Sequence, residues 1–310
     1  MTARLRIPPV PDTVFPGLAG QTAVVVGGAG GGVGTATVAM LVWSGAKVLV
    51  VDHAAERLEQ LAGRFADAVT GVPADVTTEA GIRAFEQAVS DIAVHSLVNV
   101  VGGVAPAEIG HFLELTAAQW QSSIALNFEY AVHTSRIAAL RMAEVGCGGS
   151  LVNLSVSDAR RAMPWFSPYG AARSALEAAT RTMAVELGPL GICANSVAWG
   201  LIDSPRAHSG TGSDGHRERE LIPLGRRGKV AEVASMVLFL VSDLGSYTTG
   251  QNLVVDGGLS LRASHDGPRH NIPEFLESEP ARRTLQASFA RITGVSGTAD
   301  RVPPGIMPEA

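Results

Sequence analysis

The sequence predicts an α/β fold in which helices cover both faces of a parallel β-sheet. Two observations predict it: short runs rich in β-branched residues alternate with longer segments of helical periodicity, and a glycine-rich turn joins the first run to the first helical segment. Strands that alternate with helices are typical of parallel sheets, because each connection must cross back over the sheet. With 310 residues, 46% of them hydrophobic, the chain can bury one large core.

Seven runs are expected to form the strands. In chain order they are residues 22–27, 47–51, 68–73, 96–101, 150–156, 192–198 and 252–255. Residues 33–44 show one-face helical spacing, and a longer helix is expected to begin near Thr116. Thr78 and Thr116 each precede a helical pattern, and both are expected to be N-caps that accept a hydrogen bond from the first turn.

A single domain is expected over residues 18–260, with an extension at each end. Residues 1–17 are rich in proline and lack periodicity, which predicts an irregular N-terminal arm. Residues 261–310 are predicted to form a C-terminal extension with one amphipathic helix. Within the domain, residues 203–220 are rich in Gly, Ser and His and are expected to form a long mobile loop, as lids often do.

Charge and cysteine usage narrow the classes of partner. The 24 basic and 29 acidic residues give a formal charge of -5, and basic residues never occur in runs longer than two. A nucleic-acid partner is therefore not expected, and a small-molecule partner is favoured. Cys147 and Cys193 lie far apart and outside any metal-binding spacing. The eight histidines show no spaced ligand pair, so no metal site is expected.

A location in the cytoplasm is expected. Residues 13–46 carry no charge, but the glycine run interrupts them, whereas a membrane-spanning helix needs about 20 mostly apolar residues in succession. Arg4 and Arg6 lead into prolines without the apolar stretch of a signal peptide.

The glycine-rich turn GGAGGGVG (27–34) has the properties of a dinucleotide site. Glycines let the backbone approach a pyrophosphate, and the N-terminus of the next helix offers unpaired N–H groups. The second strand ends in Asp52, twenty residues after Gly32, where a carboxylate can accept hydrogen bonds from ribose hydroxyls and would repel a 2′-phosphate. NAD is therefore favoured over NADP. The alternative is that the glycines only make a tight turn and Asp52 is a solvated strand end.

A series of motifs resembles the short-chain dehydrogenase/reductase family over about residues 18–260. The motifs are the GxxxGxG spacing of Gly28, Gly32 and Gly34, Asp75 with Val76, Asn99 with Gly102, Asn127, Tyr169 in PYGAARSALEAAT, the segment NSVAWGLIDSP, and the segment from PLGRRGKVAEV to VVDGG. The resemblance implies a Rossmann-like, doubly wound sheet of seven parallel strands. It also implies a homodimer or homotetramer that transfers a hydride between NAD(H) and a secondary alcohol or ketone.

The resemblance also assigns roles to individual residues. Tyr169 would be the acid/base, helped by Arg173, with Asn127 orienting a water in the proton relay. The residues expected to bind the cofactor are Gly28, Gly32, Val33, Gly34, Asp52, Asp75, Val76, Asn99, Tyr169, Arg173, Ile202 and Ser204. Among these, Asp75 and Val76 would flank the adenine, and Ile202 with Ser204 would hold the carboxamide. Asn127 has a second interpretation, as a helix residue whose amide satisfies a neighbouring strand.

Arg173 stands where the family has lysine, four residues after Tyr169. This spacing places a cation and a tyrosine on one face of a helix, where the cation favours the ionised phenol. A guanidinium does not give up its proton, so Arg173 can hold ribose hydroxyls but is not expected to join a proton relay. The expectation is reduced or redirected activity.

The serine that binds the substrate oxygen in the family is also replaced. Thirteen residues before Tyr169 the chain has Val156, between Ser155 and Ser157. Because side chains alternate along a strand, Ser155 is expected to face away, whereas Ser157 follows the strand end and is the candidate replacement.

An apolar substrate pocket is expected from Val156, Trp165 and Trp199, together with Met163 and Phe166. Such a pocket would suit a hydrophobic or aromatic substrate. Met163 and Phe166 have packing in a core or an interface as the alternative. Arg160 and Arg161 are interpreted as a solvated basic pair, with recognition of a substrate carboxylate as the alternative.

Two functions therefore remain open. One is an NAD-dependent oxidoreductase with Tyr169 as acid/base. The other is non-redox work on the same fold, as a lyase, cyclase, isomerase or non-catalytic partner subunit, which the changes at Arg173 and Val156 suggest.

Overall fold

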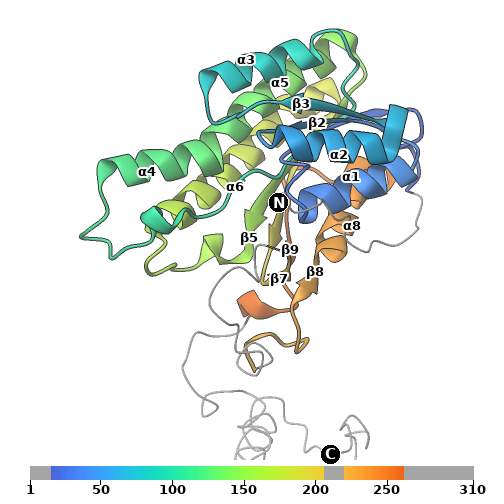
Figure 1. Cartoon of the computed structure of the whole chain (residues 1–310). Coiled ribbons are helices and arrows are strands. Elements are labelled where there is room, and N and C mark those ends of the chain that lie inside the picture. Colours follow the sequence, from blue (N-terminus) through green and yellow to red (C-terminus); the bar gives the residue numbers. More distant parts are fainter. Residues whose placement is uncertain (1–14, 206–219, 262–310) are drawn as a thin grey trace, which may run out of the picture. The chain divides into compact units, whose positions relative to one another are not determined.

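A computed structural model describes residues 15–205 and 220–261 (Figure 1). Residues 1–14 of the predicted N-terminal arm, most of the loop at 203–220 and nearly all of the C-terminal extension lie outside these residues. Within the described ranges, no helix is long and apolar enough to cross a membrane.

The predicted seven-stranded parallel sheet is confirmed, with the order β3-β2-β1-β4-β5-β6-β9. Its strands are β1 (Thr22–Val26), β2 (Lys47–Asp52), β3 (Val69–Pro73), β4 (Ser96–Asn99), β5 (Gly149–Val156), β6 (Ile192–Trp199) and β9 (Asn252–Val255). All neighbouring strands in this sheet pair in parallel. Because β2 and β3 extend from one side of β1 while β4, β5 and β6 extend from the other, the strand order reverses between β1 and β4.

Helices cover both faces of the sheet, as predicted. The helices are α1 (Val33–Trp43), α2 (Ala55–Phe65), α3 (Glu79–Val89), α4 (Ala117–Ile124), α5 (Tyr130–Val145), α6 (Ser167–Leu187) and α8 (Val230–Val241). One core cluster joins the sheet to α1, α2 and α8, and the other joins it to α3, α5 and α6 (Figure 1). Alternate residues of a strand enter opposite clusters, as Val24 and Val25 do, so both faces are buried.

The two predicted N-caps are confirmed. The Thr78 hydroxyl accepts a hydrogen bond from the Gly81 N–H (3.1 Å), and the Thr116 hydroxyl accepts one from the Gln119 N–H (3.4 Å). The Gln119 side chain accepts in return from the Thr116 N–H (2.7 Å), which completes a capping box.

Two local features differ from the expectation. The long helix from Thr116 is interrupted by a π-helical turn, Ala125–Glu129, between α4 and α5. The residues after β6 form a separate two-stranded parallel sheet of β7 (Ile202–Asp203) and β8 (Gly228–Lys229). Neither feature could be detected from the sequence, because the π-helical turn has five residues and each small strand has two, too few to show a period.

Candidate active site

The predicted site residues come from the carboxyl ends of the central strands, and these ends share one edge of the parallel sheet (Figure 1). The glycine turn follows β1, Asp52 ends β2, Val156 ends β5 and Trp199 ends β6. Open α/β sheets bind ligands at the edge where the strand order reverses. The structure thus brings the candidate cofactor-binding and catalytic residues together at the carboxyl ends of the strands.

The glycine turn is tight on its inner side and open on its outer side. A Cβ on Gly34 would lie 2.2 Å from the Gly27 carbonyl oxygen, so glycine is required where α1 packs against the turn. A Cβ on Gly30 or Gly32 would meet no atom within 4 Å. Gly32 is the N-cap of α1 and supplies no side-chain cap, so the first N–H groups of the helix are left for an anion. The turn therefore fits a dinucleotide pyrophosphate.

Asp52 is part of this turn and not a solvated strand end. Its carboxylate accepts hydrogen bonds from the Ala29 N–H (2.9 Å) and the Ala54 N–H (3.1 Å), and the residue is only 7% exposed. Each carboxylate oxygen has a further lone pair, so Asp52 can still accept from a ligand hydroxyl. The same residue thus fixes the turn and keeps a negative charge beside it.

The two residues expected at the adenine differ in their surroundings. Asp75 lies in an exposed turn, where the Thr77 hydroxyl (2.6 Å) and the Thr77 N–H (3.0 Å) both donate to its carboxylate. The bond from the Thr77 hydroxyl is the main reason that the pKa of Asp75 is lowered. The Val76 side chain is buried in the core cluster on the α3, α5 and α6 face.

Asn99 uses its side chain inside the protein. Its amide nitrogen donates to the Asn153 side chain (2.9 Å) and the Ser135 hydroxyl (3.1 Å), and its oxygen accepts from the Thr134 hydroxyl (2.8 Å). Asn99 is 1% exposed, and this network ties β4 and β5 to α5.

Arg173 is buried beneath the site, at 1% exposure. Its guanidinium donates from Nη1 to the Leu154 carbonyl (2.8 Å) and from Nη2 to the Val101 carbonyl (3.2 Å). Its Cζ lies 5.5 Å from the centroid of the Tyr169 ring, in a cation–π arrangement. The predicted pairing of Tyr169 with a cation one turn later therefore exists, and main-chain carbonyls of β5 and of the loop after β4 hold that cation.

Tyr130, which sequence reasoning missed, lies beside Arg173. Its hydroxyl donates to the Val101 carbonyl (2.7 Å), the acceptor that Arg173 also uses. Burial raises the pKa of Tyr130 well above its usual value, although the positive charge of Arg173 opposes the rise. No sequence signal separates Tyr130 from other apolar positions of its helix.

This raised pKa predicts that part of the stability is lost in alkali. A folded-state pKa above the unfolded value of 10.0 means that the contribution of Tyr130 is complete below pH 10 and is lost as pH rises toward the folded value. The loss corresponds to about 1.4 kcal/mol per pH unit for one proton. Denaturant unfolding between pH 9 and pH 11 should show a steeper loss for the parent than for Tyr130→Phe. Parallel curves would contradict the prediction.

Asn127 lies in the π-helical turn and is fully buried. Its side-chain oxygen accepts from the Gly103 N–H (2.9 Å), and its nitrogen donates to the Gly103 carbonyl (3.0 Å) and the Ser123 carbonyl (3.0 Å). Asn127 thus fixes the loop after β4. A π-helical turn at such a position is common at functional sites.

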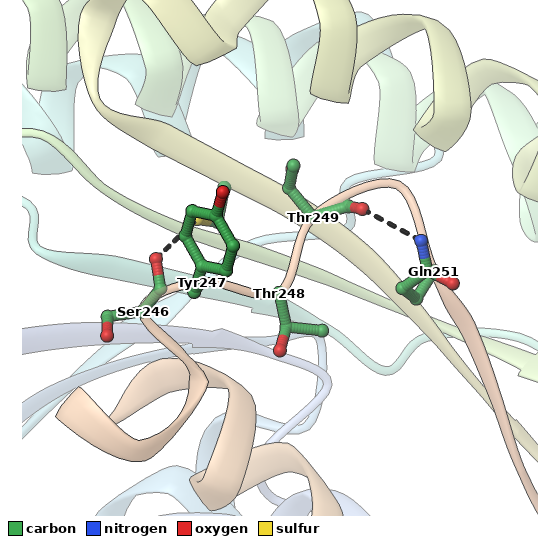
Figure 2. A pocket seen from close by; sticks show the side chains of 6 residues that line it. Ser246, Tyr247, Thr248, Thr249 and Gln251 are labelled. Atoms are coloured by element: carbon green, nitrogen blue, oxygen red, sulfur yellow. Dashed lines mark hydrogen bonds between the residues drawn. The ribbon is translucent and has the colours of Figure 1, made fainter.

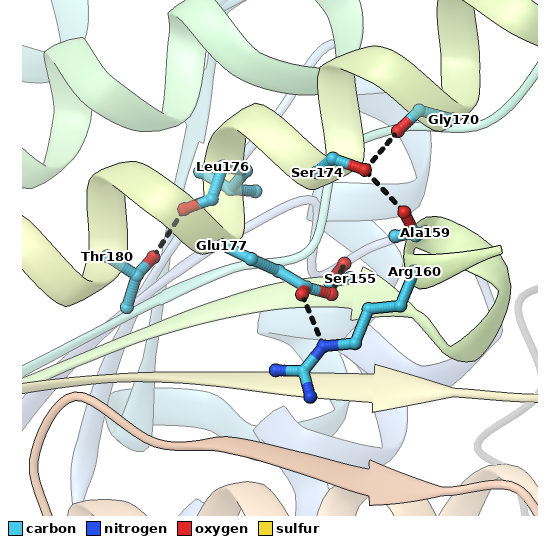
Figure 3. Close-up of polar contacts among 8 residues, drawn as sticks. All are labelled: Ser155, Ala159, Arg160, Gly170, Ser174, Leu176, Glu177 and Thr180. Atoms are coloured by element: carbon cyan, nitrogen blue, oxygen red, sulfur yellow. Dashed lines mark hydrogen bonds and ion pairs between the residues drawn. The ribbon is translucent and has the colours of Figure 1, made fainter.

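The three residues at the end of β5 differ in their available groups. Ser155 is fully buried, and its hydroxyl donates to the Glu177 carboxylate (2.8 Å; Figure 3). Val156 has no donor. Ser157 is 4% exposed, and its buried hydroxyl has no hydrogen-bond partner among the described residues. Ser157 therefore holds the free hydroxyl near the strand end.

Glu177 is a second residue that sequence reasoning missed. It is 3% exposed and accepts from the Arg160 Nε–H (3.1 Å) as well as from Ser155 (Figure 3). Its position four residues after Arg173, one turn along the same helix, was the available signal. Arg160 and Arg161 are both exposed, as the interpretation as a solvated pair expects. Each also has an acidic partner, Glu177 for Arg160 and Asp158 for Arg161.

The predicted apolar pocket is only partly assembled. Val156 and Trp199 are register partners on β5 and β6, and Trp199 also packs against the core cluster of α1 and α8. Trp165 is 55% exposed, and its ring lies edge-on to His111 at 5.8 Å between centroids. Val156 and Trp199 therefore form one apolar surface, and Trp165 lies apart on the exterior.

Ile202 and Ser204 follow β6 at the same edge. Ile202 lies in β7, where it pairs with Gly228 and packs against the core cluster of α1 and α8. Ser204 comes two residues later, next to the part of the loop outside the described residues.

A surface depression of about 420 Å³ lies elsewhere (Figure 2). It is lined by Cys193, Gln251 and the segment Ser246–Thr249. Cys193 is near the amino end of β6, so this depression is at the edge of the sheet opposite the candidate active site.

Comparison with protein families gives one match that covers most of the domain. The pattern described as enoyl-(acyl carrier protein) reductase matches residues 28–260. L-xylulose reductase of Mus musculus is 36% identical over 245 residues, which cover 78% of this chain and 97% of the relative. D-threitol dehydrogenase of Mycolicibacterium smegmatis is 31% identical over 255 residues, which cover 79% and 95%.

Solved structures give the same result for the fold. A short-chain type dehydrogenase/reductase from Mycobacterium ulcerans superposes with a TM-score of 0.74 and 30% identity, covering 87% of this chain and 99% of that chain. Acetoin dehydrogenase from Enterobacter cloacae superposes with a TM-score of 0.71 and 30% identity, covering 80% and 98%.

Proposed function

Because the chain belongs to the short-chain dehydrogenase/reductase family, whose members use a nicotinamide cofactor, we propose that it transfers a hydride between NAD(H) and a secondary alcohol or ketone. One observation carries this proposal: Tyr169 and the buried Arg173 are stacked at 5.5 Å on the helix that follows β5, at the edge where the glycine turn and Asp52 also lie. An acid/base group and a dinucleotide cradle at one edge support redox chemistry.

The chain's residues divide the work as follows. A nicotinamide held at this edge would supply the hydride in reduction and accept it in oxidation. The Tyr169 hydroxyl gives its proton to the carbonyl oxygen during reduction and takes it back during oxidation. Arg173 keeps a positive charge over the Tyr169 ring and stabilises the phenolate that remains. Asn127 fixes the loop after β4 through its two hydrogen bonds with Gly103.

The cofactor is proposed to bind along the same edge. The residues proposed to contact it are Gly28, Gly32, Val33, Gly34, Asp52, Asp75, Val76, Asn99, Tyr169, Arg173, Ile202 and Ser204. Asp52 favours NAD, because its charge would repel a 2′-phosphate and no Lys or Arg occurs in the turn. Asn99 and Arg173 are each 1% exposed and their side chains are bonded inside the protein, so they are proposed to act on the cofactor through the segments that they hold in place.

Two observations bear on the substrate. The surface formed by Val156 and Trp199 favours an apolar group beside the reacting carbon. The relatives, by contrast, are reductases of L-xylulose and a dehydrogenase of D-threitol. A panel of aryl and alkyl ketones, ketoses and their alcohols, run with NADH and NAD, tests the proposal. Turnover of a ketone or alcohol supports hydride transfer, and its class decides the substrate. No turnover across the panel would count against the redox function.

Ser157 is proposed to donate to the substrate oxygen in place of the missing serine. Its hydroxyl has no partner among the described residues, whereas the hydroxyl of Ser155 is bound to Glu177. Ser157→Ala is therefore expected to lower kcat/KM by about 10- to 100-fold, because one hydrogen bond to the reacting oxygen is lost. The matched variant Ser155→Ala should lower the melting temperature instead. Equal kcat/KM for Ser157→Ala and the parent would exclude Ser157.

The non-redox alternative rests on one observation. The guanidinium of Arg173 is bonded to two main-chain carbonyls, and an arginine cannot relay protons as a lysine does. Arg173→Lys combined with Val156→Ser tests it. If this double variant reduces ketones and the parent does not, the parent has lost redox chemistry and acts as a lyase, cyclase, isomerase or non-catalytic subunit. No gain supports a site adapted to arginine.

The assembly is proposed to be a homodimer or homotetramer, and the protein is proposed to act in the cytoplasm. Both follow from the family. Light scattering of the purified full chain gives the oligomer mass directly.

A further inference from the structure

Tyr130 and Arg173 converge on one main-chain carbonyl. The Tyr130 hydroxyl donates to Val101 O at 2.7 Å, and Arg173 Nη2 donates to the same oxygen at 3.2 Å. A carbonyl oxygen has two lone pairs, so these two donors fill its capacity. Both residues are 1% exposed, so water does not replace either donor.

The chain is shaped around the guanidinium at this point. Gly102, next to Val101, has a φ of 146°, and a Cβ there would lie 1.7 Å from Arg173 Nη2. Gly103 is held by the side chain of Asn127, three residues before Tyr130. The π-helical turn that ends just before Tyr130 thus presents both side chains to the same loop. The loop after β4 is therefore held by Asn127 and Tyr130, at the start of α5, and by Arg173 of α6.

Arg173 is also a buried cation. In the described ranges, no carboxylate lies within ion-pair distance of its guanidinium. A buried charge that no opposite charge neutralises is costly, and such groups concentrate at functional sites. A carboxylate in place of Tyr130 would neutralise Arg173, whereas a neutral phenol fixes the cation and leaves its charge directed at Tyr169.

We propose that Tyr130 is a positioning residue that, by sharing the Val101 carbonyl with Arg173, holds the guanidinium over the ring of Tyr169; its consequence for catalysis rests on the proposed function. Without the Tyr130 hydroxyl, the Val101 carbonyl loses its shorter bond and Arg173 moves with it. The Tyr169 ring then loses a fixed cation, although its own contacts are unchanged.

The test uses the full chain labelled with 13Cζ-tyrosine. The sequence has only three tyrosines, so the spectrum has three resonances, assigned from Tyr130→Phe, Tyr169→Phe and Tyr247→Phe. Tyr130→Phe is expected to shift the Tyr169 resonance. Arg173→Met is expected to shift the resonances of both Tyr130 and Tyr169, because both residues lie beside Arg173. Tyr247→Phe, which alters a fully exposed residue, should move neither.

The double variant Tyr130→Phe with Arg173→Met shows whether Tyr130 acts through Arg173. Coupled residues give non-additive effects, so Tyr130→Phe should add almost no further movement of the Tyr169 resonance once Arg173 is gone. A Tyr169 resonance that stays at its parent position in folded Tyr130→Phe would overturn the proposal. A Tyr130 resonance that does not shift in Arg173→Met would also overturn it. This second result does not require Tyr130→Phe to fold.

The spectra separate this proposal from the proposed function, because they need neither cofactor nor substrate. If the protein neither binds NADH nor turns over any ketone, the proposed oxidoreductase function is rejected. The spectra would still test whether Tyr130 positions Arg173. With a substrate identified, Tyr130→Phe should lower kcat by about tenfold with little change in KM, since it acts on the transition state. A change in KM alone would contradict positioning of Tyr169.

Discussion

Replacing Tyr169 by phenylalanine is expected to lower the turnover of any identified substrate by about 10²- to 10⁴-fold, the usual contribution of a positioned acid/base. The phenol is the only proton donor stacked on the buried cation among the described residues. The ring remains in Tyr169→Phe, so its packing over Arg173 and the fold are retained. Initial rates with saturating cofactor and a single ketone measure the effect.

Tyr247→Phe is the matched control, because it removes the same hydroxyl from a fully exposed tyrosine at the opposite edge of the sheet. It should leave the rate unchanged. If Tyr169→Phe keeps the parent rate while NADH still binds, Tyr169 is not the acid/base and the mechanism proposed above is wrong.

Replacing Gly102 by alanine is expected to destabilise the fold by about 2–5 kcal/mol and to abolish activity. A φ of 146° strains any other residue, and the new Cβ would lie 1.7 Å from Arg173 Nη2 and 2.7 Å from Asn127 Oδ1. The guanidinium would have to leave the Val101 carbonyl, so Tyr169 would lose its cation. Denaturant unfolding and initial rates measure the two effects.

Gly63→Ala is the control for this variant. Gly63 lies within α2, and a Cβ there would meet no atom within 4 Å. That change should leave activity intact and raise stability by about 0.5–1 kcal/mol, as for alanine in place of glycine within a helix. If Gly102→Ala is as stable and active as Gly63→Ala, the close contact around Arg173 does not exist in solution.

The sheet could be predicted from the sequence because each strand is marked by residues that are adjacent in the sequence. Each strand is a short β-branched run, and buried parallel strands need apolar residues on both faces. The turn at 27–34 and Asp52 could be predicted for the same reason, since strand, turn, helix and acid follow one another in sequence. The Tyr169 and Arg173 pair was predictable because helical spacing alone places the two side chains on one face.

The surroundings of Arg173 could not be predicted, because they depend on contacts far apart in sequence. Val101 O lies 72 residues from Arg173, and Tyr130 reaches it only because α5 follows a π-helical turn. The sequence could indicate that Glu177 lies on the same helix as Arg173. It could not indicate that Glu177 binds Arg160, because this bond depends on how the chain folds after β5. Val156 and Trp199 of the substrate surface could be predicted, but the position of Trp165 apart from them could not, because it depends on loops that show no periodicity.

The most direct measurement of the central claim is a titration of the purified chain with NADH and, in parallel, NADPH, followed by nicotinamide fluorescence. NADH is expected to bind about tenfold more tightly than NADPH, since the Asp52 carboxylate would accept from ribose hydroxyls and would repel a 2′-phosphate. Asp52→Ala should reduce this preference. Tighter binding of NADPH by the parent, or no binding of either nucleotide, would contradict the proposed NAD-dependent oxidoreductase.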